Sequence, residues 1–172
     1  VERALETAQP VIESRGHAAV TRLHPVALPV DGDLVRLSQV FANLLTNAAR
    51  YSPTPGPIHV TTGLDGEHAY VAVRDEGIGI DADFLPQVFD LFVQAETSLA
   101  RTQGGLGIGL TLVKRLVTLH GGTVTARSEG AGKGSEFRVC LPKYVVPAEA
   151  DGDVVPRVTD ALTRRVLVVD DN

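Results

Sequence analysis

The sequence predicts an α+β domain, a two-layer α/β sandwich with a mixed, largely antiparallel sheet. Helical patterns alternate with pairs of β-rich runs, whereas a doubly wound parallel sheet would alternate single strands with helices. The chain has 172 residues and 44% of them are hydrophobic, which suits one core of ordinary domain size. The sequence contains no internal repeat, no signal-peptide pattern and no apolar run long enough for a transmembrane helix.

Composition restricts the possible partners. The net charge of −5 argues against nucleic acid as the main partner. A bound polyphosphate would have to be held locally, by backbone amides, a metal ion and a few cations. The single cysteine, Cys140, excludes a disulfide within one chain, and its FRVCLP context predicts a buried small hydrophobe. Methionine is absent even at position 1, which indicates an excised fragment.

The dominant element is a helix predicted over residues 33–52. Residues 2–15 before it carry helical periodicity, which we expect Pro10 to interrupt, and His17–His24 reads as a strand. Asp33 is the predicted N-cap of the dominant helix, and Pro53 ends it. At 3.6 residues per turn its apolar stripe consists of Leu34, Leu37, Val40, Phe41, Leu44, Leu45 and Ala48.

The opposite face of this helix is polar, with its centre roughly 150° from the apolar stripe. It carries Arg36, Gln39, Asn43, Asn47 and Arg50. Asparagine is a weak helix former, and glutamate or lysine would solvate a helix better. Amide oxygens and a cation on one ridge suit a metal ion bridged to a phosphate. A merely hydrated face is the alternative interpretation.

The second half of the chain predicts two hairpins separated by helices and glycine-rich turns. Residues 93–104 are polar without a clear period, which indicates a loop. Residues 142–163 are rich in Pro, Ala, Asp and Glu, which indicates a linker. The predicted elements are strands Ile58–Leu64 and Ala69–Arg74, a short helix Pro86–Phe92, a helix Leu110–His120, and strands Thr123–Ser128 and Glu136–Leu141.

Two glycine clusters, DEGIGI at 75–80 and GGLGIG at 104–109, favour phosphate or nucleotide binding over simple turns. Glycines allow close backbone approach, and the second cluster opens onto a helix whose first N–H groups can bind anions. A P-loop motif is absent, and the dinucleotide pattern that begins at Gly77 lacks a βαβ unit. Asp75 and Glu76 would also repel a pyrophosphate. A carboxylate before Gly-x-Gly better suits an exocyclic amino group such as that of adenine.

Taken together, the segments resemble the catalytic ATP-binding domain of sensor histidine kinases, in the gyrase, Hsp90, histidine kinase and MutL superfamily. QVFANLLTNAARYSP resembles its asparagine box, DEGIGI and GGLGIGLTLVKRLVTLHGG its two glycine boxes, VFDLF its phenylalanine box, and GKGSEFRVCLP its closing strand. The boxes follow the family's order and spacing, from about Val11 to Pro142. The resemblance implies the Bergerat ATP-binding fold, with residues 16–142 as the catalytic domain.

The same resemblance implies roles for individual residues. Asn47 resembles the Mg²⁺ ligand, and Asn43 and Arg50 resemble contacts to phosphate or to the metal's shell. Asp75 resembles the acceptor of the adenine amino group. Phe89 and Phe92 resemble apolar anchors of a lid. The remaining implied ATP contacts are Tyr51, Gly77, Ile78, Gly79 and Ile80 near the base, Ser135 near adenine through a water, Gly105, Leu106, Gly107, Gly109 and Leu110 at the phosphates, and Arg101 at the terminal phosphate.

The implied activity is transfer of the ATP γ-phosphate, with Mg²⁺, to a histidine on a separate dimerisation domain in two-component signalling. ATP-hydrolysing relatives have a glutamate where Asn43 stands, and an amide is no general base. None of the histidines (His17, His24, His59, His68 and His120) has the sequence context of the family's phosphate acceptor. An ATP-hydrolysing member of the superfamily, a non-binding scaffold domain and a serine-kinase relative stay open as alternatives.

The ends of the chain imply a larger parent protein. Residues 1–15 are expected to be a linker or helix from the upstream dimerisation domain, and residues 143–163 a linker. The tail at 164–172, RRVLVVDDN, resembles a truncated first strand of a receiver domain, with Asp170 and Asp171 as its Mg²⁺-binding acids. A generic buried strand is the alternative. The resemblance implies a hybrid kinase, cytoplasmic in this part and homodimeric, whose receiver is a further partner; the fragment alone could be a monomer.

Overall fold

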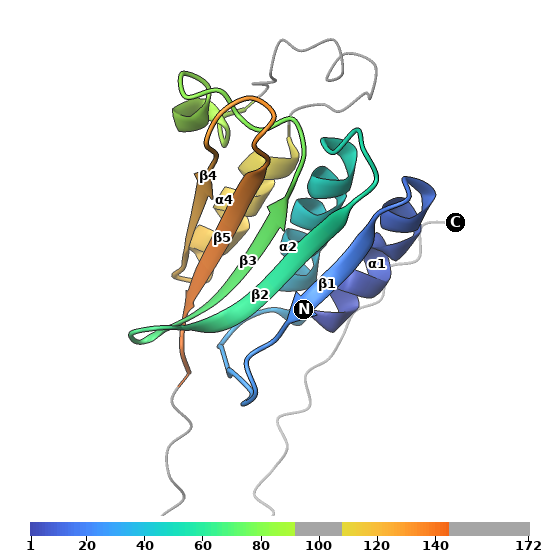
Figure 1. The fold of residues 1–172 in the computed structure, drawn as a ribbon. Coiled ribbons are helices and arrows are strands. Elements are labelled where there is room, and N and C mark those ends of the chain that lie inside the picture. Colours follow the sequence, from blue (N-terminus) through green and yellow to red (C-terminus); the bar gives the residue numbers. More distant parts are fainter. Residues whose placement is uncertain (92–107, 145–172) are drawn as a thin grey trace, which may run out of the picture.

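The computed structural model describes residues 1–91 and 108–144, which form a five-stranded sheet with helices packed on one face (Figure 1). The strand order is β1-β2-β3-β5-β4. The β1–β2 pair is parallel, and the other three pairs are antiparallel. The predicted α+β class with a mixed, largely antiparallel sheet is therefore confirmed. The strands are β1 (Ala18–Arg22), β2 (Pro57–Asp65), β3 (His68–Asp75), β4 (Thr123–Arg127) and β5 (Ser135–Pro142).

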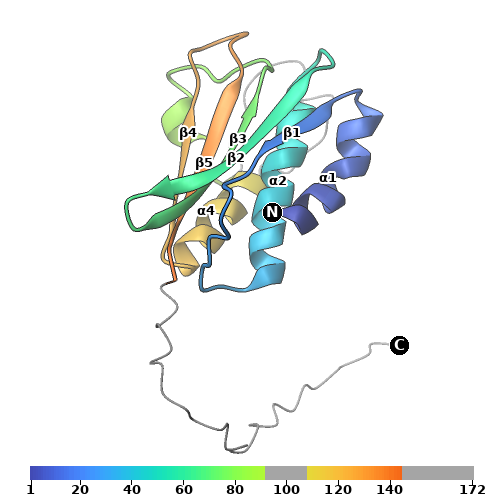
Figure 2. The same cartoon turned by 60° about the horizontal axis from the view of Figure 1, so that its bottom comes forward.

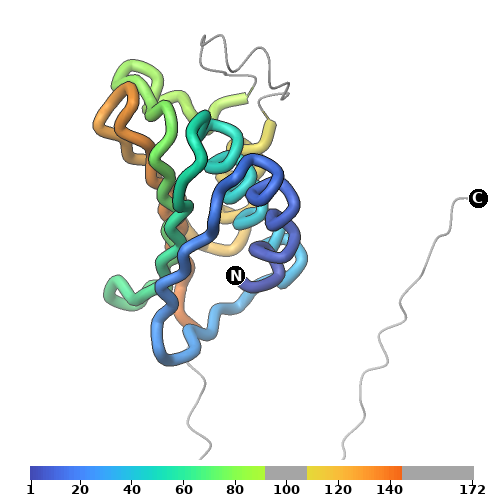
Figure 3. The backbone as a smooth tube through the Cα atoms, turned by 45° about the vertical axis from the view of Figure 1, so that its right-hand side comes forward, coloured from blue at the N-terminus to red at the C-terminus, as the bar shows by residue number. Residues whose placement is uncertain are grey.

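Helices α1 (Glu2–Ser14), α2 (Leu34–Arg50) and α4 (Gly109–Leu119) form the second layer, with α2 in the middle (Figure 2). Figure 3 shows the helix layer and the sheet from the side. The apolar stripe of α2 is buried against the sheet, and Val40 and Leu44 are fully inaccessible. Helix α1 contributes Ala4, Ala8 and Ile12 to the same core, so it is an integral part of the sandwich. Across the described ranges no helix combines the length and apolarity that crossing a membrane requires.

The first turn of α2 is fixed by its N-cap and by the end of α4. The Asp33 carboxylate accepts hydrogen bonds from the backbone N–H groups of Val35 (2.8 Å) and Arg36 (3.0 Å). The Asp33 N–H donates to Nε2 of His120 at 3.0 Å, while Nδ1 of His120 lies 2.7 Å from the carbonyl oxygen of Leu116. His120 therefore carries its proton on Nδ1 and ties the last turn of α4 to the first turn of α2.

The cap of α2 should show as a pH-dependent contribution to stability. The Arg36 N–H bond is the main reason that the pKa of Asp33 lies below its ordinary value of 3.8. A lowered carboxyl pKa stabilises the fold above the unfolded-state pKa, and this contribution is lost as pH falls through the folded-state pKa. We expect Asp33→Asn to lower Tm at neutral pH, with the difference from wild type closing below about pH 4.

Thermal unfolding monitored by circular dichroism between neutral pH and about pH 2 measures this difference. Asp31→Asn is the matched control, because Asp31 is an exposed carboxylate two residues earlier. A Tm difference for Asp33→Asn that stays constant over the whole pH range would contradict the role of the carboxylate charge.

Three details of the helices differ from the predictions. Helix α1 runs through Pro10 without interruption, because Pro10 and Glu6 are both exposed and water can satisfy the carbonyl that loses its helical donor. Leu34, assigned to the apolar stripe, is 58% exposed because it lies in the first turn, beyond the edge of the sheet packing. The predicted helix Pro86–Phe92 is only a 3₁₀ turn at Leu85–Gln87, and Phe92 lies outside the described residues.

The prediction for Cys140 was wrong in its direction. Strand β5 alternates with Phe137, Val139 and Leu141 buried against the helices. Cys140 has the opposite parity and is a half-buried free thiol on the outer face of the sheet. Arg138 shares that face, where its guanidinium stacks 3.8 Å from the centre of the Tyr70 ring.

Candidate nucleotide-binding site

The predicted site residues that the structure describes gather at one end of the sandwich. The C-terminal end of α2, the N-terminal end of α4 and the turn that follows β3 all lie at this end, which is uppermost in Figure 1. Antiparallel placement of α2 and α4 makes this possible, because one helix ends where the other begins. The segment Gly77–Ile80 lies between α2 and α4 in the sequence, and the end of β3 places it at this end of the sandwich.

The polar ridge of α2 (Asn43, Asn47 and Arg50) is directed away from the core. Asn43 and Asn47 are half-buried and Arg50 is exposed, whereas Leu44 and Ala48 beside them are buried. Within the described ranges neither asparagine amide makes a hydrogen bond. Neither amide is a buried polar group without a partner, because both residues are only half-buried. Their oxygens are thus available to a cation. Mg²⁺ takes few protein oxygens and completes its octahedron with water and phosphate, so these residues fit it.

Asp75, the last residue of β3, is only 3% exposed and is held by three hydrogen bonds. Its Oδ1 accepts the backbone N–H of Gly77 (2.8 Å) and of Ser135 (3.2 Å). Its Oδ2 accepts the Ser135 hydroxyl at 2.6 Å. Oδ1 is thereby saturated, while Oδ2 retains one lone pair for a further donor. The carboxylate is therefore a fixed hydrogen-bond acceptor at the end of the sheet.

Ser135 supports this acceptor directly. The sequence predicted that Ser135 would lie near a base through a water molecule. In the structure its hydroxyl donates to Asp75, which leaves the hydroxyl oxygen free to accept a bond from water. Tyr51, the C-cap of α2, is 37% exposed at the same end of the molecule.

Gly77 and Gly79 are required by contacts within the protein. A Cβ on Gly77 would lie 2.3 Å from the carbonyl oxygen of Tyr51, the same oxygen that accepts the Ile78 N–H at 2.9 Å. Gly79 has φ +72°, and a Cβ there would lie 2.0 Å from the carbonyl oxygen of Gly130. The turn after β3 is therefore pressed against the end of α2 on one side and the β4–β5 turn on the other.

The β4–β5 turn, residues 128–134, forms the other wall of this turn. The Gly132 N–H donates to the carbonyl oxygen of Ile78 at 2.7 Å, and the Gly134 N–H donates to that of Gly77 at 3.1 Å. Its glycines at 130, 132 and 134 all have positive φ. The sequence predicted a glycine-rich turn here but not its contact with the DEGIGI segment.

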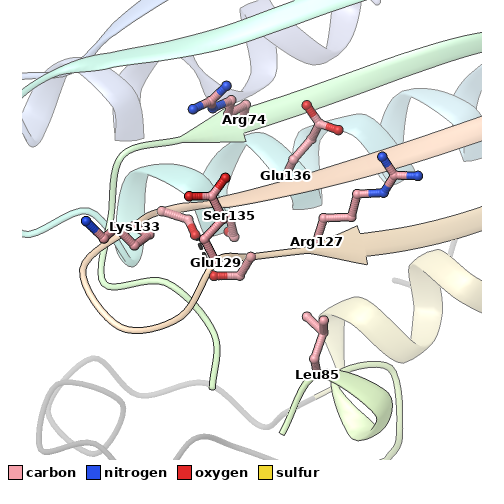
Figure 4. A pocket seen from close by; sticks show the side chains of 9 residues that line it. Arg74, Leu85, Arg127, Glu129, Lys133, Ser135 and Glu136 are labelled. Carbon is pink, nitrogen blue, oxygen red and sulfur yellow. Dashed lines mark hydrogen bonds between the residues drawn. The ribbon is translucent and has the colours of Figure 1, made fainter. Parts of the chain in front are cut away.

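A cavity of about 430 Å³ lies next to this turn, but on the other face of the sheet (Figure 4). Arg74, Glu136 and Arg127 line it from neighbouring positions on β3, β5 and β4. Their parity is opposite to that of the buried Val73 and Phe137, so they are directed away from the helices. These three side chains therefore line the cavity from the face opposite to the asparagine ridge, whereas Ser128, Gly134 and Ser135 line it at the end of the sheet.

The family comparison decides the identity of this arrangement. A family model described as "Histidine kinase-, DNA gyrase B-, and HSP90-like ATPase" matches residues 32–145. The chain belongs to this family. It is an ATP-binding catalytic domain of the type found in sensor histidine kinases, which confirms the predicted resemblance.

Individual relatives agree with this assignment. The chain is 36% identical over 150 residues to the autoinducer 2 sensor kinase/phosphatase LuxQ of Vibrio parahaemolyticus, covering 81% of the chain and 17% of LuxQ. It is 38% identical over 135 residues to hybrid signal transduction histidine kinase D of Dictyostelium discoideum, covering 64% and 9%. A structure of full-length ShkA in complex with AMPPNP superposes with a TM-score of 0.70 at 26% identity, covering 84% of the chain and 30% of ShkA. The chain thus spans under a fifth of the length of LuxQ and of hybrid kinase D.

The phosphate end of this kinase domain is described only in part. Helix α4 begins at Gly109, and within residues 1–91 and 108–144 no side chain caps its first turn; N–H groups at the start of a helix, such as that of Leu110, can bind an anion. Before it, Val88 is buried and Phe89 packs edge-on against Phe137, with ring centres 6.1 Å apart. Phe89 therefore packs on the core, and the lid that it is expected to anchor lies outside the described residues. The predicted contacts Arg101, Gly105, Leu106 and Gly107 and the predicted loop 93–104 lie outside the described residues.

Two supporting residues, Ser128 and His17, were missed by the sequence analysis. The Ser128 hydroxyl bonds both glycine-rich turns, at Ile80 and at Gly134. His17 is 6% exposed; its Nε2 lies 3.1 Å from the Ser52 carbonyl oxygen, and its Nδ1 accepts the Gly56 N–H at 3.2 Å. The alternating glycines after Ser128 were the sequence signal that could have indicated its role. No sequence signal indicates the role of His17, since its partners are more than 30 positions away.

Proposed function

We propose that this domain binds Mg²⁺–ATP and donates the γ-phosphate to a histidine on a separate dimerisation domain of the same protein. The observation that carries the proposal is the buried acceptor Asp75, fixed at the same end of the fold as Asn43 and Asn47, whose amides have no hydrogen bond to the described residues. The relatives that are named sensor kinases, and the AMPPNP complex of ShkA, support it by similarity.

The base end of the site favours adenine. Three donors from the protein leave Asp75 with one lone pair on Oδ2, and only a donor can occupy it. The 6-amino group of adenine is such a donor, whereas guanine has a carbonyl oxygen at this position. A buried carboxylate that faces a carbonyl oxygen without a donor is strongly disfavoured, so we expect preference for ATP over GTP.

The phosphate end is assigned to the first turn of α4 and to the polar ridge of α2. Bound Mg²⁺ would neutralise part of the phosphate charge. Asn47 is the proposed protein ligand, Asn43 and Arg50 contact phosphates or metal-bound water, and the first-turn N–H groups of α4 bind a phosphate. Asn43 cannot abstract a proton from water near neutral pH, so hydrolysis is slow and transfer depends on positioning.

Replacing Asn47 by Ala is expected to remove the metal-dependent part of ATP binding. With Mg²⁺ present, calorimetry should show affinity reduced by about 10- to 100-fold, whereas affinity measured in EDTA should stay near the wild-type value. Gln39→Ala is the matched control, because Gln39 lies on the same face of α2 two turns earlier. Equal losses with and without Mg²⁺ would contradict the assignment of Asn47 to the metal.

Phosphoryl transfer itself is tested with a separately supplied histidine-bearing helical domain and γ-labelled ATP. The expected product is acid-labile, base-stable label on that domain, with little free phosphate. Rapid phosphate release by the fragment alone would favour an ATP-hydrolysing member of the family. Failure of ATP to raise the Tm would favour a scaffold domain.

The organisation of the parent protein is part of the proposal. We infer a homodimeric hybrid kinase that works in the cytoplasm and whose catalytic domain, expected at residues 16–142, also includes helix α1, because α1 packs into the same core. The chain then enters from the dimerisation domain through α1, and residues 164–172 begin a receiver domain after the linker 143–163. The similarity to hybrid kinase D supports this organisation. Residues 145–172 lie outside the described part of the chain.

A further inference from the structure

Ser128 joins the two glycine-rich turns at the base end of the site. Its hydroxyl oxygen accepts the Ile80 N–H at 2.9 Å, from the turn after β3. It also accepts the Gly130 N–H at 3.2 Å, within its own turn. The hydroxyl hydrogen is donated to the carbonyl oxygen of Gly134 at 2.7 Å, which is shorter than the 3.4 Å to that of Gly130. Both lone pairs and the proton of Ser128 are therefore used.

No other described side chain bonds the backbones of both turns. Backbone contacts between them are the Gly132 N–H to Ile78 and the Gly134 N–H to Gly77. Those bonds join Gly77 and Ile78 to the second half of the β4–β5 turn. Ser128 adds the connection at Ile80, where the turn leaves the sheet.

The carbonyl group that Ser128 fixes belongs to the residue before Ser135. Gly134 is so close to β3 that a Cβ there would lie 2.1 Å from the carbonyl oxygen of Asp75. Ser135 follows at once and supplies two of the three donors to the Asp75 carboxylate. A displacement of Gly134 therefore moves both Ser135 donors relative to Asp75.

We propose that Ser128 is a positioning residue that sets the orientation of Asp75 and thereby the selectivity for the base. It touches neither the base nor the phosphates; it acts through Ile80 on one turn and through Gly134 and Ser135 on the carboxylate. This inference rests on the proposed nucleotide function. It extends that function to a residue that lies outside the assigned contacts.

The test compares ATP and GTP affinities of wild type, Ser128→Ala and Ser128→Thr by calorimetry. Loss of one hydroxyl that bonds two backbone groups should weaken ATP binding about tenfold and leave weak GTP binding unchanged, so the ATP/GTP ratio falls by the same factor. Ser128→Thr retains the hydroxyl and should restore the ratio. Thr118→Ala is the matched control, because its hydroxyl donates to one helix carbonyl in the last turn of α4, at the end of the sandwich opposite to the site.

The outcomes are separable from those of the proposed function. Wild type without ATP preference would overturn both proposals. Wild type that prefers ATP, with a Ser128→Ala variant of equal preference, would overturn the positioning role alone. If Ser128→Ala does not fold, two other measurements decide: hydrogen exchange of the Ile80 amide in wild type, and the ATP/GTP affinity ratio of Ser128→Thr. A rapidly exchanging Ile80 amide, or a Thr variant that does not prefer ATP, overturns the inference.

Discussion

Asp75→Asn is expected to weaken ATP binding about 100-fold, which corresponds to roughly 3 kcal/mol. Oδ1 accepts two backbone N–H groups, so the new amide nitrogen must take the position of Oδ2. The Asn amide then presents N–H donors where the adenine amino group requires an acceptor. Calorimetry with Mg²⁺–ATP at neutral pH measures this loss.

Glu76→Gln is the control for Asp75→Asn, because it removes the charge of the neighbouring carboxylate, which is exposed. We expect near wild-type affinity from it. Unchanged ATP affinity in Asp75→Asn, with the fold intact by circular dichroism, would show that this carboxylate does not bind the base.

Gly79→Ala is expected to destabilise the domain by about 3 kcal/mol or more and to abolish ATP binding. Two costs combine at this position. Alanine is strained at φ +72°, and its Cβ would lie 2.0 Å from the backbone oxygen of Gly130, which cannot rotate away. Because that oxygen belongs to the β4–β5 turn, relief of the clash separates the two glycine-rich turns.

Gly132→Ala isolates the first cost, the backbone strain. Gly132 has φ +73°, nearly the same angle, but a Cβ there would meet no atom within 4 Å. We expect a loss of only about 1 kcal/mol from this variant, with ATP binding retained. Urea unfolding of both variants gives the difference. Equal destabilisation would mean that backbone strain alone, and not the close approach, requires glycine at position 79.

The fold was predictable where one element carries a long, regular pattern. The apolar and polar stripes of α2 appear in the structure as predicted, apart from Leu34. Periodicity over 17 residues outweighs single deviations. In β5 the pattern FRVCLP has apolar residues at both parities, so the facing of Cys140 depends on its partners on β3 and β4. The predicted interruption at Pro10 was wrong, because a proline disrupts a helix less where water replaces the missing hydrogen bond.

The sequence proposed residues for the site but not the residues that support them. Short motifs that are typical of nucleotide binding contain Asp75, Asn43 and Asn47. Ser128 acts on Ile80 across 48 positions of sequence, and no local pattern reports such a distance. The glycines of DEGIGI were identified, but their expected reason, close approach to a base, is accompanied by one that sequence could not show: contact with the backbone of Tyr51 and Gly130.

The bond between His120 and the Asp33 N–H has a mechanical consequence for α2 and α4. It joins these helices at the end opposite to the candidate nucleotide site. The packing there is tight, since a Cβ on Gly32 would lie 2.6 Å from the His120 ring. A small change in the angle between the helices at His120 would therefore produce a larger displacement at their other ends, where the phosphates are proposed to bind.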